Sequence, residues 1–392
     1  MKNQRVFVLI AVLLGGMGQG VVAPKLPELL HESGALFMSS GISATLMYFA
    51  IFISTYKYGS MADRGKVHLL LGCGLLFYAA ALVGLGVAPN QQTVFALRFA
   101  EGLSMSAIFV AADFVLGRVS AAHERGQWLA YYGVALSIGL LLGPTLALVA
   151  FKLGSIAGLP PRLASSALFP LGIVAALSAA LAAPGFFTRV PVIAAPAQEG
   201  LHLNFGALTT GGVYGFMEAA LVAVFPVLAV KSFHVPPEYC LLTVILSAAV
   251  SSVAWGMIAD RRGPRLVATA LVGMLAVGCT VFCVWCLAQA NSDPAAIAYG
   301  SCVFFGILAG GLYPVGFAWL LLDLPESSYG HASGSFARAY GLGSLSGPLA
   351  IGAASQYFGA LGLFSTMFAA SALGLLAILY VQRTPRLKPK LT

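Results

Sequence analysis

Two short stretches of the sequence are near repeats of each other: GSMADRGK at residues 59–66 and GMIADRRGPR at residues 256–265. Each stretch places an Asp-Arg pair and a glycine in a break between long apolar runs. The two stretches begin 197 residues apart in a chain of 392 residues, which is about half its length. This spacing indicates a chain built from two related halves.

The runs on either side of these breaks are almost free of charge. Hydrophobic residues make up 59% of the chain and charged residues only 9%, against about 25% charged residues in soluble proteins. The 13 acidic and 21 basic residues are too few to cover a globular surface, so we expect most of the surface to face lipid. A membrane β-barrel requires segments of about 10 residues with alternating polarity, which the sequence lacks. The fold class is therefore expected to be an all-α membrane protein.

Cutting the chain at its charged residues and at its Pro, Gly and Asn breaks gives twelve apolar segments. A helix needs about 20 such residues to span a bilayer. The expected spans are 6–23, 38–58, 67–88, 93–117, 127–150, 164–187, 206–228, 239–259, 266–289, 295–322, 333–353 and 361–381. They form two six-helix bundles, residues 1–188 and 206–392, joined by a cytoplasmic linker at 189–205 that is rich in Ala and Pro.

The distribution of Lys and Arg over the short loops predicts the orientation of the chain. With the N-terminus in the cytoplasm, 14 of the 21 basic residues fall in cytoplasmic segments and four fall outside. We therefore expect an inner (plasma) membrane protein with both termini in the cytoplasm. The same scatter of basic residues argues against a nucleic-acid partner, because no single basic patch forms.

A second pair of repeats strengthens the evidence for two halves. GLLLGP at residues 139–144 lies in the fifth expected span, and GSLSGP at residues 343–348 lies in the eleventh. Glycines four residues apart let helices approach closely. We therefore expect helix packing at six positions: Gly139, Gly143, Pro144, Gly343, Gly347 and Pro348.

With these repeats, the chain resembles the major facilitator superfamily. The family's loop between spans two and three reads G-x-x-x-D-[RK]-x-G-[RK]-[RK], which this chain matches with one residue fewer after the Arg, whereas the second copy keeps the full spacing. The fourth-span motif R-x-x-q-G matches residues 98–102 with Glu at the q position. The fifth-span motif, associated with proton antiporters, is matched by GLLLGP, but Ala147 and Leu148 replace its final two glycines. The resemblance implies two pseudo-symmetric six-helix bundles and transport by alternating access.

The resemblance also implies a conformational gate built from the two Asp-Arg loops. In the family the loop Asp lies against the start of span eleven, which here corresponds to residues 332–335. Asp113, near the inner end of span four, is expected to pair with Arg64 or Lys66 as a latch; the alternative is a site for a transported proton. The expected gate residues are Asp63, Arg64, Lys66, Asp113, Asp260, Arg261 and Arg265.

Charges within the spans are functional candidates because they are costly in lipid. Arg98 and Glu101 are three residues apart and share a helix face, so they either satisfy each other or contact an anionic solute. Glu218 has no basic residue within a helical turn, and burial disfavours its charged form. Glu218 and Glu101 are therefore the expected proton-coupling residues; for Glu218 the alternative is a neutral structural side chain.

The family's central cavity is lined mainly by spans one, four, seven and ten. The polar and aromatic residues that these spans offer, together with Arg338 of span eleven, are the expected lining: Gln19, Arg98, Glu101, Ser104, Tyr214, Glu218, Tyr313, Trp319 and Arg338. For the aromatic residues, ordinary core or lipid packing is the alternative. Arg338 is equally consistent with snorkelling or with bridging the two halves.

The function expected from these features is secondary active transport of a small organic solute, with proton-coupled efflux as the favoured mode. The alternative is a proton-coupled importer of an anionic metabolite or chelate, suggested by the two arginines. Enzymatic motifs such as H-E-x-x-H and G-x-S-x-G are absent from the sequence, so an enzyme is not expected. We expect a monomer in the lipid bilayer with no cofactor and no metal, including at the helically spaced Cys279, Cys283 and Cys286, which have no His or carboxylate nearby.

Overall fold

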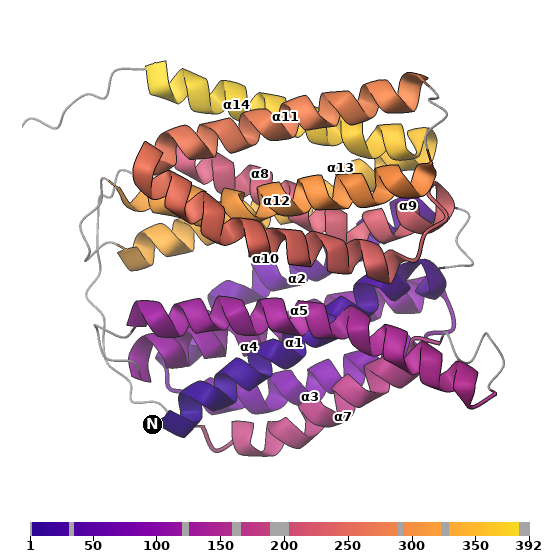
Figure 1. Ribbon diagram of the computed structural model, residues 1–392. Helices are drawn as coiled ribbons and strands as arrows, with labels where there is room; N and C mark the ends of the chain where they lie inside the picture. Colours follow the sequence, from indigo (N-terminus) through magenta and orange to yellow (C-terminus); the bar gives the residue numbers. More distant parts are fainter. Residues whose placement is uncertain are drawn as a thin grey trace, which may run out of the picture. The chain divides into compact units, whose positions relative to one another are not determined.

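The computed structural model describes residues 2–30, 35–119, 125–158, 166–188, 204–288, 293–322 and 329–383. Within these ranges all regular structure is helical (Figure 1). The helices are α1 (Lys2–Leu29), α2 (Leu36–Asp63), α3 (Val67–Gly86), α4 (Gln91–Val119), α5 (Arg125–Ile156), α7 (Leu168–Gly185), α8 (Phe205–Ala223), α9 (Phe225–Lys231), α10 (Pro237–Arg262), α11 (Pro264–Ala288), α12 (Pro294–Leu321), α13 (Tyr329–Phe358) and α14 (Ala360–Arg383). The prediction of an all-α membrane protein is confirmed.

Ten of these helices are long and apolar enough to cross a membrane, and an eleventh span results if α8 and α9 are joined. The two helices meet at a bend of 42°. Pro226 lies at the start of α9, and a proline interrupts a helix because it has no N–H to donate. The remaining predicted span corresponds to α13, which has 30 residues but is enriched in Gly and Ser. The predicted count of twelve is consistent with this arrangement, since each predicted segment overlaps a described helix.

The chain divides into two compact units. The first comprises Met1–Pro196 with Leu221–Ile245, and the second comprises Ala197–Ala220 with Leu246–Thr392. The segment Leu221–Ile245 joins the first unit because α9 packs against α1 and α2. The units thus differ from the predicted halves in this segment, and residues 189–203 of the predicted linker lie outside the described residues. The division at 1–188 and 206–392 stays a prediction.

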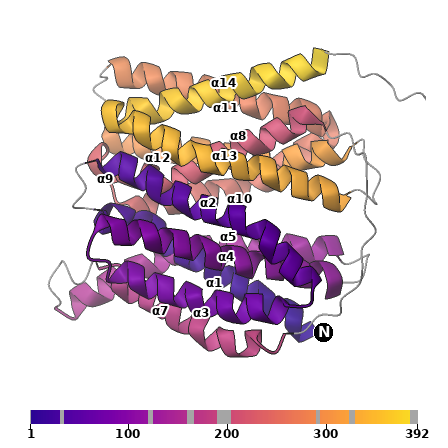
Figure 2. The same ribbon diagram turned by 180° about the vertical axis from the view of Figure 1, so that it is seen from behind.

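In the first unit, α5 packs directly along α1 (Figure 2). The contact is close because glycines face backbone: a Cβ atom added to Gly139 would overlap the carbonyl oxygen of Leu13, and one added to Gly143 would overlap Gly20. The backbones approach to a distance that leaves no room for a methyl group. A substitution on this face must therefore push the two helices apart.

The second unit repeats this contact with α13 and α8. A Cβ atom added to Gly343 would overlap the carbonyl oxygen of Gly212, and one added to Gly347 would overlap that of Phe216. The glycines of the two repeats thus occupy equivalent positions, each on a helix that packs against the first helix of its bundle. The sequence repeat corresponds to a structural repeat.

The surface of both units is rich in large apolar side chains. Phe77 on α3 is 67% exposed, Val250 on α10 is 78% exposed, and Val277 on α11 is 66% exposed. Exposed apolar surface of this extent is typical of a protein surrounded by lipid. The charges within the spans are, by contrast, few, and they define the candidate site.

Candidate functional site

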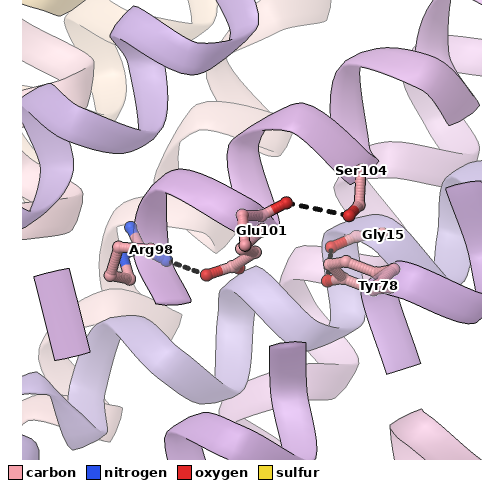
Figure 3. Close-up of polar contacts among 6 residues, drawn as sticks. Gly15, Tyr78, Arg98, Glu101 and Ser104 are labelled. Atoms are coloured by element: carbon pink, nitrogen blue, oxygen red, sulfur yellow. Dashed lines mark hydrogen bonds and ion pairs between the residues drawn. The ribbon is translucent and has the colours of Figure 1, made fainter. Parts of the chain in front are cut away.

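Arg98 and Glu101 form an ion pair on one face of α4 in the first unit. The guanidinium Nη1 of Arg98 donates to Oε2 of Glu101 over 2.6 Å (Figure 3). The residues are 3% and 0% exposed, respectively. Each side chain keeps one buried atom without a hydrogen-bond partner among the described residues, Nε of Arg98 and Oε1 of Glu101. The pair thus neutralises both charges inside the helical bundle, as one of the two interpretations of the sequence expected.

Glycines on α1 let α3 come close to this region. The hydroxyl of Tyr78 on α3 donates to the carbonyl oxygen of Gly15 over 2.8 Å (Figure 3). A Cβ atom added to Gly18 would overlap that same hydroxyl. Gln19 on α1 is buried. The hydroxyl of Ser104 on α4 donates to the backbone carbonyl oxygen of Ala100, one turn earlier on the same helix. The glycines around Gln19 are therefore explained by helix packing.

Glu218 lies on α8 in the second unit, next to three tyrosines that we name the tyrosine cluster: Tyr214, Tyr313 and Tyr340. The hydroxyl of Tyr340 on α13 donates to Oε2 of Glu218 over 2.8 Å. Tyr214, one helical turn before Glu218, stacks on Tyr340 with ring centroids 5.7 Å apart. Tyr313 on α12 meets Tyr214 edge to face at 5.4 Å. The structure thus brings three predicted residues together with Tyr340.

Tyr340 was absent from the sequence-based candidates, although the packing of α13 on α8 explains its position. A Cβ atom added to Gly215 would overlap the carbonyl oxygen of Tyr340. Gly215 is three residues from Glu218, so the close approach at this glycine directs the tyrosine side chain toward the carboxylate. The repeated G-x-x-x-G pattern three residues after Tyr340 was the available signal.

Two predicted lining residues lie apart from the tyrosine cluster. Trp319 is 2% exposed and packs against Gly206, which lies twelve residues before Glu218, or about 18 Å along α8. Arg338 is exposed and only two residues from Tyr340, so the two side chains occupy different faces of α13. Neither residue contributes to the surroundings of Glu218.

A second charged cluster, which sequence reasoning missed, lies at the Leu29 end of α1. We name it the lysine clasp: Lys25, Glu28 and Glu238. Nζ of Lys25 lies 3.6 Å from Oε2 of Glu28 and 3.6 Å from Oε1 of Glu238 on α10. The lysine and Glu238 side chains are 9% and 11% exposed, whereas Glu28 is 41% exposed and accepts a hydrogen bond from the backbone N–H of Ala167. A lysine among apolar residues beside two prolines was the only signal in the sequence.

The predicted gate is described in part. Arg64 and Lys66 are exposed in the turn between α2 and α3, and Arg261 and Arg265 are exposed around the turn between α10 and α11. The side chains of Asp63, Asp113 and Asp260, and those of residues 331–334 on α13, lie outside the described residues. The latch between Asp113 and the loop therefore stays a prediction.

The two Asp-Arg turns share a backbone feature. Gly65 and Gly263 have φ angles of +77° and +84°. Glycine adopts this left-handed conformation without the steric cost that other residues incur. The short turn between the two helices therefore requires a residue with a positive φ angle. This requirement explains why a glycine follows shortly after Asp-Arg in both repeats.

Metal ligands are not gathered anywhere in the described part of the chain. No group of three or more His, Cys, Asp or Glu side chains there is arranged to hold an ion. Cys279, Cys283 and Cys286 lie on one helix, α11, and Cys279 is buried among apolar residues.

Comparison with known proteins identifies the family. The family model of the Major Facilitator Superfamily matches residues 8–209 and 207–392. An uncharacterized MFS-type transporter from Enterobacter sp. (strain 638) is 24% identical over 352 residues, which cover 87% of this chain and 86% of that protein. The quinolone resistance protein NorA from Staphylococcus aureus (strain MRSA252) is 24% identical over 143 residues, 36% of this chain and 37% of NorA.

A solved structure with the same fold is that of a bacterial homologue of the human lysosomal transporter Spinster, in an inward-facing and occupied conformation. It has a TM-score of 0.74 and 14% sequence identity, covering 97% of this chain and 96% of that one. At this identity the likeness concerns the fold. Because the family model matches both halves, the chain belongs to the Major Facilitator Superfamily of membrane transporters.

Proposed function

We propose that the protein is a proton-coupled exporter of a small organic solute, and that Glu218 binds and releases the coupled proton. The observation that supports this proposal most directly is the partner of the Glu218 carboxylate, which is a neutral tyrosine hydroxyl at 2.8 Å. A hydroxyl both donates and accepts hydrogen bonds. Tyr340 therefore keeps its contact whether Glu218 is charged or protonated, so the proton can leave and return without breaking the site.

Glu101 is the weaker candidate for proton coupling. Arg98 lies 2.6 Å away and favours the charged carboxylate. Protonating Glu101 would leave a guanidinium buried without its counter-charge, which costs about 3–5 kcal/mol when a buried pair is broken. We assign this pair to the stability of the first unit, and the coupled proton to Glu218.

Export is favoured over import of an anion. The alternative function relied on Arg98 and Arg338 as anion-binding groups. The charge of Arg98 is compensated by Glu101, and Arg338 lies on a different face of α13 from Tyr340. Similarity to a quinolone resistance protein over 36% of the chain also supports export.

The lysine clasp is proposed as an outer gate. The orientation predicted from the Lys and Arg residues of the loops places the Leu29 end of α1 on the outer side of the membrane. At that end Lys25 links α1 to the beginning of α10 through Glu238. Separating two nearly buried charges is costly unless both reach water. The ion pair would therefore hold the two helix ends together in one conformation and break in the other.

The coupling is tested in proteoliposomes with an imposed pH gradient. A solute is first identified by its ability to raise the thermal stability of the purified protein, because a ligand that binds the folded state stabilises it. Wild type should then accumulate the solute against its concentration gradient. Glu218→Gln should lose this accumulation but retain exchange of labelled for unlabelled solute. Equal accumulation by the variant would remove Glu218 from the mechanism, and a wild type that ignores the pH gradient would refute coupling altogether.

A further inference from the structure

Four arginines lie at one end of the second unit, and we name them the arginine patch: Arg261, Arg262, Arg265 and Arg383. Arg261 and Arg262 end α10, and Arg265 is the second residue of α11. Arg383 ends α14. All four side chains are exposed. Among the described residues none of the four takes part in an ion pair, so the patch presents positive charges that no described side chain neutralises.

The packing of α14 on α11 brings Arg383 to the turn between α10 and α11. The two helices run side by side (Figures 1 and 2). Nε2 of Gln382 donates to Oγ1 of Thr269 over 2.9 Å. Arg265 lies one helical turn before Thr269 and shares its face of α11, whereas Arg383 directly follows Gln382. The fold thus gathers a basic patch that the scatter of basic residues along the sequence does not show.

Exposed apolar side chains lie beside the patch on the same helices. Leu266, directly after Arg265, is 57% exposed, and Tyr380, three residues before Arg383, is 74% exposed. The membrane spans of α10, α11 and α14 all end at this edge of the unit. Tyrosine is enriched at the level of the lipid headgroups. The surface therefore combines cationic groups at the membrane boundary with apolar groups that face the acyl chains.

An anionic phospholipid complements both parts of this surface. A guanidinium binds a phosphate group through two parallel hydrogen bonds. The orientation predicted from the loop charges places this end in the cytoplasm, where anionic lipids give the membrane a negative surface potential. A soluble phosphate would contact the arginines but leave the apolar side chains uncovered. A phospholipid would cover both with one molecule.

We propose that the arginine patch binds the phosphate headgroup of an anionic phospholipid whose acyl chains lie along α11 and α14. The headgroup links the turn between α10 and α11 to the end of α14, so the bound lipid holds three helix ends of the second unit together. A ligand of the folded state also raises its stability. The inference concerns the lipid-facing surface and is independent of the solute, of the coupled proton and of Glu218.

Native mass spectrometry of the purified protein in detergent tests the inference. The protein is titrated with dioleoylphosphatidylglycerol, which is anionic, and with dioleoylphosphatidylcholine, which has the same acyl chains and no net charge. Wild type should bind the phosphatidylglycerol at least tenfold more tightly. Equal binding of the two lipids by wild type would overturn the site, and this comparison needs no variant.

A matched pair of double variants locates the site. Arg262→Gln/Arg383→Gln removes two charges of the patch and avoids Arg261 and Arg265, which are also predicted gate residues. It should weaken binding of phosphatidylglycerol about tenfold to thirtyfold, the range expected for two basic groups near an anionic headgroup. Lys57→Gln/Lys152→Gln removes two exposed charges from the first unit and should bind as wild type does. An equal loss in both double variants would indicate diffuse attraction by net charge and would overturn the patch.

Thermal unfolding in detergent distinguishes a lipid from a soluble anion. Phosphatidylglycerol should raise the melting temperature of wild type, and inorganic phosphate at the same concentration should not. Equal stabilisation by inorganic phosphate would show that the arginines bind a free anion and would contradict the lipid site. Stabilisation by phosphatidylglycerol that persists unchanged in Arg262→Gln/Arg383→Gln would place the lipid elsewhere and would contradict it as well.

Discussion

Replacing Lys25 by Met should open the end of α1 at which the lysine clasp lies. The substitution keeps the length of the side chain and removes the positive charge that lies 3.6 Å from both Glu28 and Glu238. At 3.6 Å, one pair of unit charges is worth about 4–5 kcal/mol at an effective dielectric constant of about 20, before the cost of desolvation. Desolvation of the buried charges offsets much of this attraction, so the effect of the substitution follows from the cost of leaving a buried charge without its partner.

The free energy lost when Lys25 is replaced differs between its contacts with Glu238 and with Glu28. The contact with Glu238 is nearly buried at both ends, and removing one partner of such a pair costs about 3–5 kcal/mol. Glu28 is 41% exposed, so solvent screens its contact to about 0–1 kcal/mol. Lys25→Met should cost about 3 kcal/mol or more. Glu238→Gln should cost less, because Lys25 keeps Glu28 as a partner.

A native cysteine reports the opening. Cys240 is 1% exposed on α10, two residues after Glu238. In a protein whose other five cysteines are replaced by alanine, Cys240 is labelled on intact cells with a membrane-impermeant maleimide. Because 1.4 kcal/mol corresponds to a factor of ten, Lys25→Met should raise the labelling rate by up to about a hundredfold. The control is Lys231→Met, which removes an exposed positive charge from the neighbouring α9.

The double variant Lys25→Met/Glu238→Gln makes the test sharper. It removes both nearly buried charges, so labelling should fall back toward the wild-type rate, and the effect of the double variant should be smaller than the sum of the two single effects. Unchanged labelling in Lys25→Met would refute the reasoning, and so would an equal increase in Lys231→Met.

Further predictions concern helix packing and the buried pair. Gly343→Ala should lower the free energy of unfolding by about 1–3 kcal/mol, because its methyl group would overlap the backbone of α8. Gly300→Ala on α12 has open space around it and should be neutral or stabilising by up to about 1 kcal/mol. Melting temperatures in detergent measure both effects, and equal effects of the two variants would contradict the close packing. Arg98→Met should destabilise the protein by about 3–5 kcal/mol, and adding Glu101→Gln should restore part of that loss. A fully stable Arg98→Met protein would show that the pair contributes nothing.

The helices were predictable because lipid imposes a simple rule on sequence. A spanning segment must be long, apolar and helical, so every described helix overlaps a predicted span. The bend between α8 and α9 was not predicted, although Pro226 was its visible cause. The polar character of α13 follows from its close packing on α8, where Gly and Ser replace larger apolar residues.

Side-chain contacts in the candidate site were predictable only where one helix supplies both partners. The Arg98–Glu101 pair is local, and its spacing of three residues was sufficient to expect it. Tyr340 is 122 residues from Glu218, and no periodicity in the sequence relates them. Lys25 and Glu238 are likewise joined only by the packing of α1 near the beginning of α10. Contacts of this kind depend on tertiary structure and not on local pattern.

The most direct test of the account measures proton movement that follows solute movement. Proteoliposomes with an internal pH-sensitive dye are loaded with solute, clamped at zero membrane potential, and diluted into solute-free buffer at the same pH. If Glu218 exchanges a proton for solute, the interior of wild-type vesicles acidifies as solute leaves, and Glu218→Gln vesicles lose solute with no change of pH. An interior that becomes alkaline would indicate that proton and solute move together, and would contradict the exporter. Acidification in Glu218→Gln equal to that in wild type would contradict the role of Glu218.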